Sequence, residues 1–228
     1  IQSEKLVEVG RLSASIAHEI NNPLTVIAYA AQLLLREEPI SGFQQELLER
    51  IEGESDRLKT LTGSLLSFSR ARESVRRPTD LNEVLRDVLR LLRFEFNRRS
   101  IDLEESYGTL PVFSADSNQL KQVFINLLLN AAQVLPRGGR VAVRTVRLGS
   151  DEVMAVIADS GPGVPAELRD KIFEPFFSTR KEGEGTGLGL YICRTIVAEH
   201  GGGLELGSEP EWGGVFHVRL PARELLVP

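Results

Sequence analysis

The chain has 228 residues, 42% hydrophobic and 26% charged, which is typical of a soluble globular protein with one large or two ordinary domains. Its formal net charge of −5 gives no electrostatic reason to expect nucleic-acid binding. No apolar run approaches the roughly 18 residues of a membrane span, and a single cysteine, Cys193, excludes an intrachain disulfide.

These totals predict a cytoplasmic protein in a reducing compartment, without membrane contact in this part of the chain. No signal peptide is visible. Because the chain begins with Ile1 and not with methionine, we expect it to be a fragment, and a sensor or membrane anchor of the full-length protein would lie upstream.

Residues 1–72 show helical spacing and no convincing strand pattern. Apolar residues from Val9 to Ile20 form one stripe, and a second stripe runs from Leu47 to Phe68. The segment EEPISGF between them contains a proline and a glycine, which favour a tight reversal. Two such helices bury little apolar surface alone, so we expect a helical hairpin that pairs with a second copy into a four-helix bundle.

The segment SIAHEINNPLTV within the first helix contains a histidine that faces away from the apolar stripe. At about 100° per residue, His18 lies roughly 200° from Ile16, on the same face as Asn22. A neutral imidazole is a nucleophile, and the neighbouring Glu19 carboxylate can accept its proton or fix its tautomer. The alternative is an ordinary surface histidine, and this segment alone does not decide between the two.

The pattern changes after ESVRRPTD at 73–80, a polar segment with a proline that we interpret as a linker. Three helices follow in the sequence: DLNEVLRDVLRLLRFEF with an acidic cap, SADSNQLKQVFINLLLNAAQVL, and GLGLYICRTIVAEHGG, which ends at glycines. Three strands are expected at RVAVRTVRL, EVMAVIAD and GGVFHVRLPA. This mixture predicts an α+β sandwich with helices on one face of a sheet.

Two segments of this second half combine polar groups with special backbone freedom. In NLLLNA, Asn126 and Asn130 lie one turn apart, and an amide oxygen suits Mg²⁺; a solvent-facing polar stripe is the alternative. In ADSGPG, the Asp159 carboxylate ends an apolar strand and can accept a hydrogen bond from an exocyclic amine such as that of adenine. Gly161 and Gly163 let the backbone approach a flat ring, although a plain turn has the same composition.

Two further segments follow. IFEPFFSTR carries three phenylalanines that form either a satellite hydrophobic cluster or the anchor of a mobile lid, with Arg180 available to a γ-phosphate. In GEGTGLGL, alternate glycines lead into a helix at about Leu188, which indicates an anion site at the helix start. The segment is not a Walker A loop, since no Gly-Lys-Ser/Thr follows, and its spacing differs from the dinucleotide fingerprint.

Taken in order, the five segments resemble the H, N, G1, F and G2 boxes of the sensor histidine kinases, over about residues 8–220. The His-Glu followed by Asn-Pro-Leu is most similar to the nitrogen-regulation type. The resemblance implies a dimerisation and histidine-phosphotransfer domain at 1–72, a linker at 73–80 and a catalytic ATP-binding domain at 81–228. The catalytic domain is expected to have the fold shared by gyrase B, heat-shock protein 90 and MutL.

The resemblance also implies an enzyme: ATP-dependent autophosphorylation of a histidine, followed by transfer to an aspartate of a response-regulator receiver domain. His18 matches the phospho-acceptor, Glu19 its acidic neighbour and base, and Asn22 the residue that positions water when such kinases dephosphorylate their partner. Asn130 matches the Mg²⁺ ligand. The implied nucleotide contacts are Asn126, Asn130, Asp159, Gly161, Gly163, Arg180, Gly185, Thr186, Gly187, Leu188 and Gly189.

Asn126 bears on the rival functions. ATP-hydrolysing members of the wider superfamily carry a glutamate there as a general base, and asparagine cannot take a proton at neutral pH. We therefore expect Mg-ATP to bind without efficient water activation, which leaves His18 as the nucleophile and argues against a gyrase-type ATPase. A scaffold with a degenerate nucleotide pocket would lack motif residues, and none is missing. Phosphatase activity toward the regulator stays open beside the kinase activity.

Overall fold

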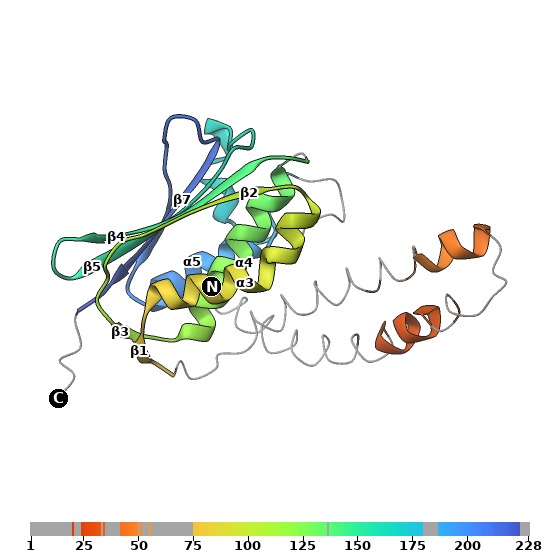
Figure 1. Cartoon of the computed structure of the whole chain (residues 1–228), viewed down its shortest axis with the longest axis horizontal. Helices are drawn as coiled ribbons and strands as arrows, with labels where there is room; N and C mark the ends of the chain where they lie inside the picture. The colour runs from red at the N-terminus through yellow and green to blue at the C-terminus, as the bar shows by residue number, and fades with distance from the viewer. Residues whose placement is uncertain are drawn as a thin grey trace, which may run out of the picture. The chain divides into compact units, whose positions relative to one another are not determined.

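The computed structural model describes residues 20, 24–32, 34, 42–49, 51, 55, 75–135, 137–179 and 187–223. The chain divides into two compact units, 1–73 and 74–228, each of which is described by itself (Figure 1). In the first unit, the described stretches 24–32 and 42–49 are helical, as the predicted hairpin requires. Within the described residues, no helix combines the length and apolar character that crossing a bilayer needs.

Several large apolar side chains among the described residues of the first unit are exposed in the single chain. Leu24, Ala28 and Ala31 are buried, at the spacing of one helical stripe. Large apolar side chains that remain exposed are Ile20, Val26, Ile27, Tyr29, Leu34, Phe43, Leu47 and Ile51. The hairpin therefore presents a surface of the kind that a second helical pair covers in a bundle.

The second unit is an α+β sandwich. Its elements are β1 (Arg77–Thr79), α3 (Leu81–Arg98), β2 (Asp102–Tyr107), β3 (Phe113–Ala115), α4 (Ser117–Val134), β4 (Arg140–Leu148), β5 (Glu152–Asp159), two single-turn 3₁₀ helices (Ala166–Leu168 and Lys171–Phe173), α5 (Gly189–Glu199), β6 (Gly203–Leu206) and β7 (Gly214–Pro221). The main sheet has the strand order β2-β4-β5-β7-β6, with β2 parallel to β4 and the other neighbours antiparallel.

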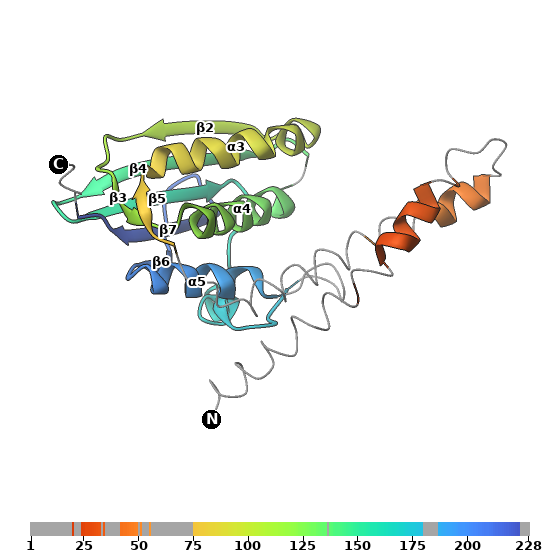
Figure 2. The same ribbon diagram turned by 90° about the horizontal axis from the view of Figure 1, so that it is seen from below.

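The three long helices lie on one side of this sheet (Figure 1) and run side by side in the order α3, α4, α5 (Figure 2). The acidic cap predicted for α3 is confirmed: the Asp80 carboxylate accepts hydrogen bonds from the backbone N–H groups of Asn82 and Glu83. Asp116 caps α4 in the same way. Each cap satisfies backbone donors that the first helical turn leaves without partners.

The strands β4 and β5 have the bounds of the two predicted segments, and β7 lies within the third. The alternation on β4 shows which way each side chain points, because the Thr145 hydroxyl donates to the Asn82 side chain of α3 at 2.8 Å. Thr145 pairs with Ala155, so Ala155, Ile157 and Asp159 share the helix-covered face.

Four strands were not predicted. β1 and β3 have three residues each and pair with one another, which places residues 77–79 of the predicted linker inside the folded second unit. β2 is a polar edge strand, and β6 has only four residues.

Candidate functional site

The site begins at Asp159, the last residue of β5, whose side chain is buried at 4% exposure. Its Oδ1 accepts a hydrogen bond from the Gly161 N–H at 2.9 Å, and the Gly214 N–H also donates to the carboxylate. Burial raises the pKa of Asp159 above its ordinary value, and the two N–H groups partly oppose this shift. The result is a buried carboxylate held by two backbone N–H groups.

The turn that follows Asp159 is pressed between β7 and α4. Gly163 has φ +77°, and a Cβ there would come within 2.5 Å of the Gly213 carbonyl oxygen. A Cβ on Gly161 would lie 2.6 Å from Asp159 Oδ1 and 3.1 Å from Val134 Cγ2. Only glycine fits at either position, and the contact with Val134 brings the end of α4 to the Asp159 turn.

The predicted asparagines lie on the α4 face that leads to this turn. Asn126 donates from Nδ2 to the Gly189 carbonyl oxygen at 3.5 Å, which joins α4 to the start of α5. Asn130 and Val134 follow at intervals of one turn and share that face. Asn130 is partly buried, and its side chain has no hydrogen-bond partner among the described residues. It therefore stands between the first turn of α5 and the Asp159 turn with its amide free to bind a ligand.

The start of α5 offers backbone donors. Leu188 occupies the cap position, is buried at 1% exposure and provides no side-chain cap. The N–H groups of the first turn of this 11-residue helix point away from its body, which suits an anion. Gly187 before it has φ +66°, and a Cβ there would overlap the backbone of Phe176. The phenylalanine segment and the glycine segment thus lie in direct contact.

The three phenylalanines have different environments. Phe173 is buried, and the Arg194 guanidinium of α5 lies 5.3 Å from its ring centroid. Phe177 is partly buried, whereas Phe176 is 60% exposed with φ +67°, a conformation that costs energy in a non-glycine residue. The hydrophobic cluster predicted for this segment accounts for Phe173 and leaves Phe176 outside it.

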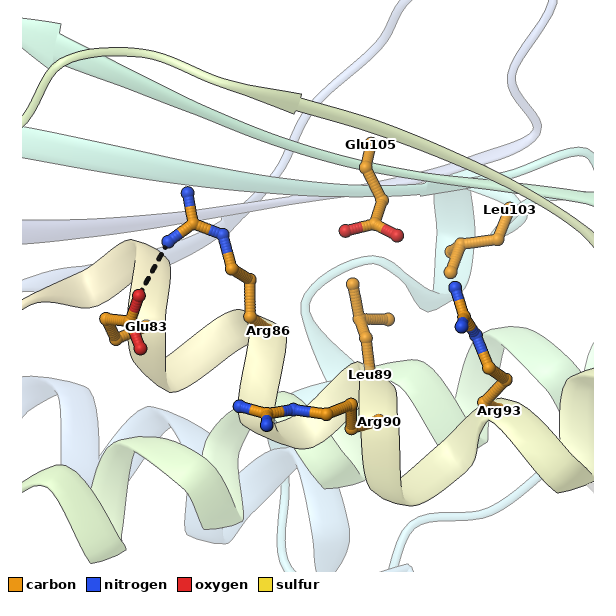
Figure 3. A pocket seen from close by; sticks show the side chains of 7 residues that line it. All are labelled: Glu83, Arg86, Leu89, Arg90, Arg93, Leu103 and Glu105. Carbon is orange, nitrogen blue, oxygen red and sulfur yellow. Dashed lines mark hydrogen bonds and ion pairs between the residues drawn. The ribbon is translucent and has the colours of Figure 1, made fainter.

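A concave feature lies between α3 and β2, with a volume of about 270 Å³ (Figure 3). Three arginines of α3 and Glu105 of β2 line it, but none of the predicted site residues does. Arg86 is already paired with Glu83 at 2.9 Å, and Glu105 accepts a hydrogen bond from the Tyr107 hydroxyl. Its charges are largely satisfied internally, so we assign no ligand to it.

Of the predicted nucleotide contacts, eight are described. Contacts link Asn126 to Gly189, Gly187 to the phenylalanine segment, and Gly161 to the end of α4, so one region holds Asn126, Asn130, Asp159, Gly161, Gly163, Gly187, Leu188 and Gly189. His18, Glu19, Asn22, Arg180, Gly185 and Thr186 lie outside the described residues. Their roles, and the nitrogen-regulation type of the His18 segment, stay predictions.

The sequence reasoning missed Gly213 and Gly214. The Gly213 N–H donates to the Asp159 carbonyl oxygen at 2.9 Å, and a Cβ on Gly214 would overlap the Asp159 carboxylate. A pair of glycines at the start of a strand is a signal of close backbone approach that would have indicated them.

The described residues contain no group of three or more histidine, cysteine, aspartate or glutamate side chains that would hold a metal by themselves. Mg²⁺ in nucleotide sites usually has few protein ligands.

Two family models match the chain. The family described as "Histidine kinase-, DNA gyrase B-, and HSP90-like ATPase" matches residues 115–224, and "His Kinase A (phospho-acceptor) domain" matches residues 8–74. The sensor histidine kinase ZraS of Escherichia coli K12 is 36% identical over 221 residues, which are 96% of this chain and 47% of ZraS. The chain thus spans about half the length of the curated relatives it matches.

Solved structures, among them histidine kinases, are also similar to this chain. Full-length ShkA in complex with AMPPNP has a TM-score of 0.75 and 28% identity, and covers 93% of this chain and 45% of ShkA. The nucleotide-free catalytic domain of the histidine kinase ThkA has a TM-score of 0.59 and 34% identity, over 64% of this chain and 97% of that domain. ThkA in complex with the response regulator TrrA has a TM-score of 0.70 and 30% identity, over 96% of this chain and 64% of that chain.

Proposed function

Because this chain belongs to the sensor histidine kinases of two-component systems, we propose that it phosphorylates His18 from ATP and passes the phosphoryl group to an aspartate of a response regulator. The observation that carries the proposal is the contiguous set of contacts from the buried Asp159 carboxylate, along α4, to the start of α5. ShkA was solved with AMPPNP and ThkA with a response regulator, which supports both halves of the reaction.

The described residues suit a bound adenine nucleotide. The Asp159 carboxylate is an acceptor for the exocyclic amine of adenine, and we infer that the backbone of the Gly161–Gly163 turn beside it contacts the flat base. The backbone donors at the start of α5 suit the phosphate chain. Binding at these three places would fix the nucleotide at both ends and orient its terminal phosphate, which is most of what phosphoryl transfer needs from an enzyme.

We include Mg²⁺ in the proposal, with Asn130 as its protein ligand. The free amide of Asn130 on the α4 face between the phosphate and adenine ends fits this role. When bound, the ion would offset the negative charge of the phosphate oxygens.

In the proposed reaction, a ring nitrogen of His18 attacks the γ-phosphorus, and the bond from that phosphorus to the β,γ-bridging oxygen breaks to release ADP. Glu19 accepts the imidazole proton. The receiver aspartate then attacks the phosphohistidine, the P–N bond breaks, and a phosphoaspartate forms. Asn126 takes no part as a base, because its amide cannot accept a proton and instead donates to Gly189.

We also propose that the first unit forms a homodimer through its helices. The support is the row of large apolar side chains that the single chain leaves exposed, including Leu47 at 43% and Ile51 at 42% on the predicted second stripe. Replacing both with aspartate should convert the dimer to a monomer in light scattering. A dimer of unchanged mass would show that the interface lies elsewhere.

The kinase proposal is tested with γ-labelled ATP and Mg²⁺. The chain should acquire acid-labile, base-stable label, and His18→Ala should lose that label while it keeps its affinity for ATP. Asp159→Ala should instead weaken nucleotide binding, with Asp151→Ala, an exposed carboxylate at the other end of the β5 hairpin, as a matched control. Rapid phosphate release without protein label would favour the gyrase-type ATPase.

Phosphatase activity toward the regulator is a further prediction that rests on Asn22. Asn22→Ala should autophosphorylate normally and dephosphorylate the regulator slowly. Normal dephosphorylation by that variant would remove the role assigned to Asn22.

A further inference from the structure

The face of the sheet that the helices leave open carries a small apolar cluster of its own. Its buried members are Ala142 of β4, Val156 and Ala158 of β5, and Val215 of β7. Two partly buried side chains pack against it: Met154, toward the far end of β5, and Trp212, in the turn before β7. Trp212 is the only tryptophan of the chain, and none of the sequence motifs includes it.

Trp212 is linked to the Asp159 turn through Arg140. The Arg140 guanidinium lies 5.0 Å from the centroid of the indole ring, a cation–π geometry. The backbone of Arg140 makes two hydrogen bonds to the residue after Asp159: its N–H donates to Ser160 Oγ at 2.9 Å, and its carbonyl accepts from the Ser160 N–H at 3.0 Å. One residue therefore contacts both the indole and the start of the site turn.

Trp212 is also linked to Asp159 through its own chain. Gly213 and Gly214 follow it directly, and their N–H groups donate to the Asp159 carbonyl oxygen and to its carboxylate. A Cβ on Gly213 would overlap the Gly161 carbonyl oxygen, so the two backbones touch without a gap. A shift of the 212–214 segment must therefore move the Asp159 carboxylate or remove a hydrogen bond from it.

The turn before Trp212 does not hold this position by itself. Glu211 has φ +71°, a left-handed conformation that is unfavourable for a glutamate. The Trp212 N–H makes only a 3.3 Å hydrogen bond to the Glu209 carbonyl oxygen. The packing of the indole on the apolar cluster and under Arg140 adds contacts that fix the segment in place.

We propose that Trp212 and Arg140 are positioning residues for adenine recognition: by packing on the open face of the sheet they hold the 212–214 backbone against Asp159 and so set the selectivity for the adenine base. The inference rests on the proposed function, because it takes Asp159 as the group that binds the exocyclic amine. It adds a determinant on the opposite face of the sheet from the nucleotide.

The test compares the dissociation constants of ATP and inosine triphosphate, which carries a 6-oxo group in place of the amine, by displacement of a fluorescent nucleotide. In Trp212→Ala the affinity for ATP should fall about tenfold, while that for inosine triphosphate changes by no more than about twofold. Trp212→Phe keeps a ring under Arg140 and should restore most of the selectivity. Met154→Ala removes apolar packing from the same cluster at its far end and is the control for a general loss of stability.

The proposal is overturned if Trp212→Ala keeps the selectivity of the parent, or if Met154→Ala loses it equally at a similar melting temperature. Should Trp212→Ala not fold, Arg140→Gln removes the cation–π contact and keeps the backbone hydrogen bonds. Its control, Glu104→Gln, loses the 3.3 Å ion pair of Arg140 without touching the indole. The selectivity for ATP over inosine triphosphate must fall in Arg140→Gln and be retained in Glu104→Gln. A parent chain with no preference for ATP would instead contradict the role of Asp159 in the proposed function.

Discussion

The two faces of the five-stranded sheet use the same strands but are built differently. The face toward α3, α4 and α5 carries large, fully buried side chains such as Ile157 and Leu220. The open face carries alanines and valines covered by Trp212 and Met154, with ion pairs on the same face such as Arg219–Glu205 at 3.6 Å. Asp159 lies where the two meet, since its carboxylate faces the helices while the turn from the open face supplies one of its hydrogen bonds. Stability therefore comes mainly from one face, and the geometry of the site depends on both.

The largest expected effect separates two neighbours on β5. Ile157 faces the helices at 1% exposure, and Val156 belongs to the open-face cluster at 5% exposure. Ile157→Ala should lower the free energy of unfolding by about 2–5 kcal/mol, because the helix layer cannot collapse onto the cavity. Val156→Ala should cost about 1–2 kcal/mol. Urea unfolding followed by Trp212 fluorescence reports on the second unit alone, since the chain has no other tryptophan.

Nucleotide affinity is the control for this pair. Ile157→Ala should bind ATP normally at temperatures where it remains folded, because Ile157 belongs neither to the Asp159 turn nor to the cluster that supports Trp212, whereas Val156 is a member of that cluster. Equal destabilisation by the two substitutions would contradict the inference that the helix-covered face of the sheet contributes more to stability than the open face.

Sequence patterns located the elements that are regular over many residues. The alternation of β4 and β7 and the caps of α3 and α4 are local, so they could be predicted. The strand β2 could not, because Asp102, Glu104 and Glu105 give it the composition of a loop, and only its parallel pairing with β4 makes it a strand. β1 and β3 have three residues each and pair with one another although α3 and β2 lie between them in the sequence, so neither strand has a local signal.

The site could be predicted where its chemistry is carried by a side chain or a glycine of a motif. Asp159, Asn126 and Asn130 fall in this class. Gly214 does not, because its role follows from the register that pairs it with Asp159 in β7 and β5. The contact of His200 could not be predicted for the same reason. The glycines after it indicate a helix end, but its Nε2 also accepts a hydrogen bond from the Asp116 N–H at 3.1 Å, which joins the end of α5 to the start of α4.

A smaller effect on ATP affinity is expected when pH changes the protonation of Asp159, which lies where the two faces of the sheet meet. Burial raises the pKa of Asp159, and binding of adenine needs the ionised carboxylate. ATP affinity should therefore fall as pH drops through that raised pKa, by up to about tenfold per pH unit. The free energy of unfolding should change in the opposite sense, because the folded chain favours the protonated form of the buried carboxyl. The stabilisation that Asp159 contributes is present below its ordinary pKa of 3.8 and is lost as pH rises through the raised pKa. Calorimetric titrations of ATP across acidic pH, with adenosine to separate out phosphate protonation, measure the first effect.

Asp159→Asn supplies the comparison. Its affinity for adenosine should be weaker at neutral pH and independent of pH over the same range. A parent chain whose adenosine affinity stays constant through mildly acidic pH would show that the carboxylate is not the group that binds the base.

The smallest effect is expected from the charges of the open face. Glu209 forms an ion pair with Arg144 and lies 3.9 Å from His217 Nε2, and both of these partners are partly exposed. Exposed pairs of this kind contribute about 0–1 kcal/mol, and salt screens them. Glu209→Gln should therefore change the melting temperature little, and in high salt the melting temperatures of the variant and the parent should be equal. Glu209 is in the same turn as Trp212, so the variant also tests which interaction holds that turn. If the packing of the Trp212 ring holds it, Glu209→Gln should keep the selectivity for ATP over inosine triphosphate. If the ion pair of Glu209 holds it, the selectivity should fall.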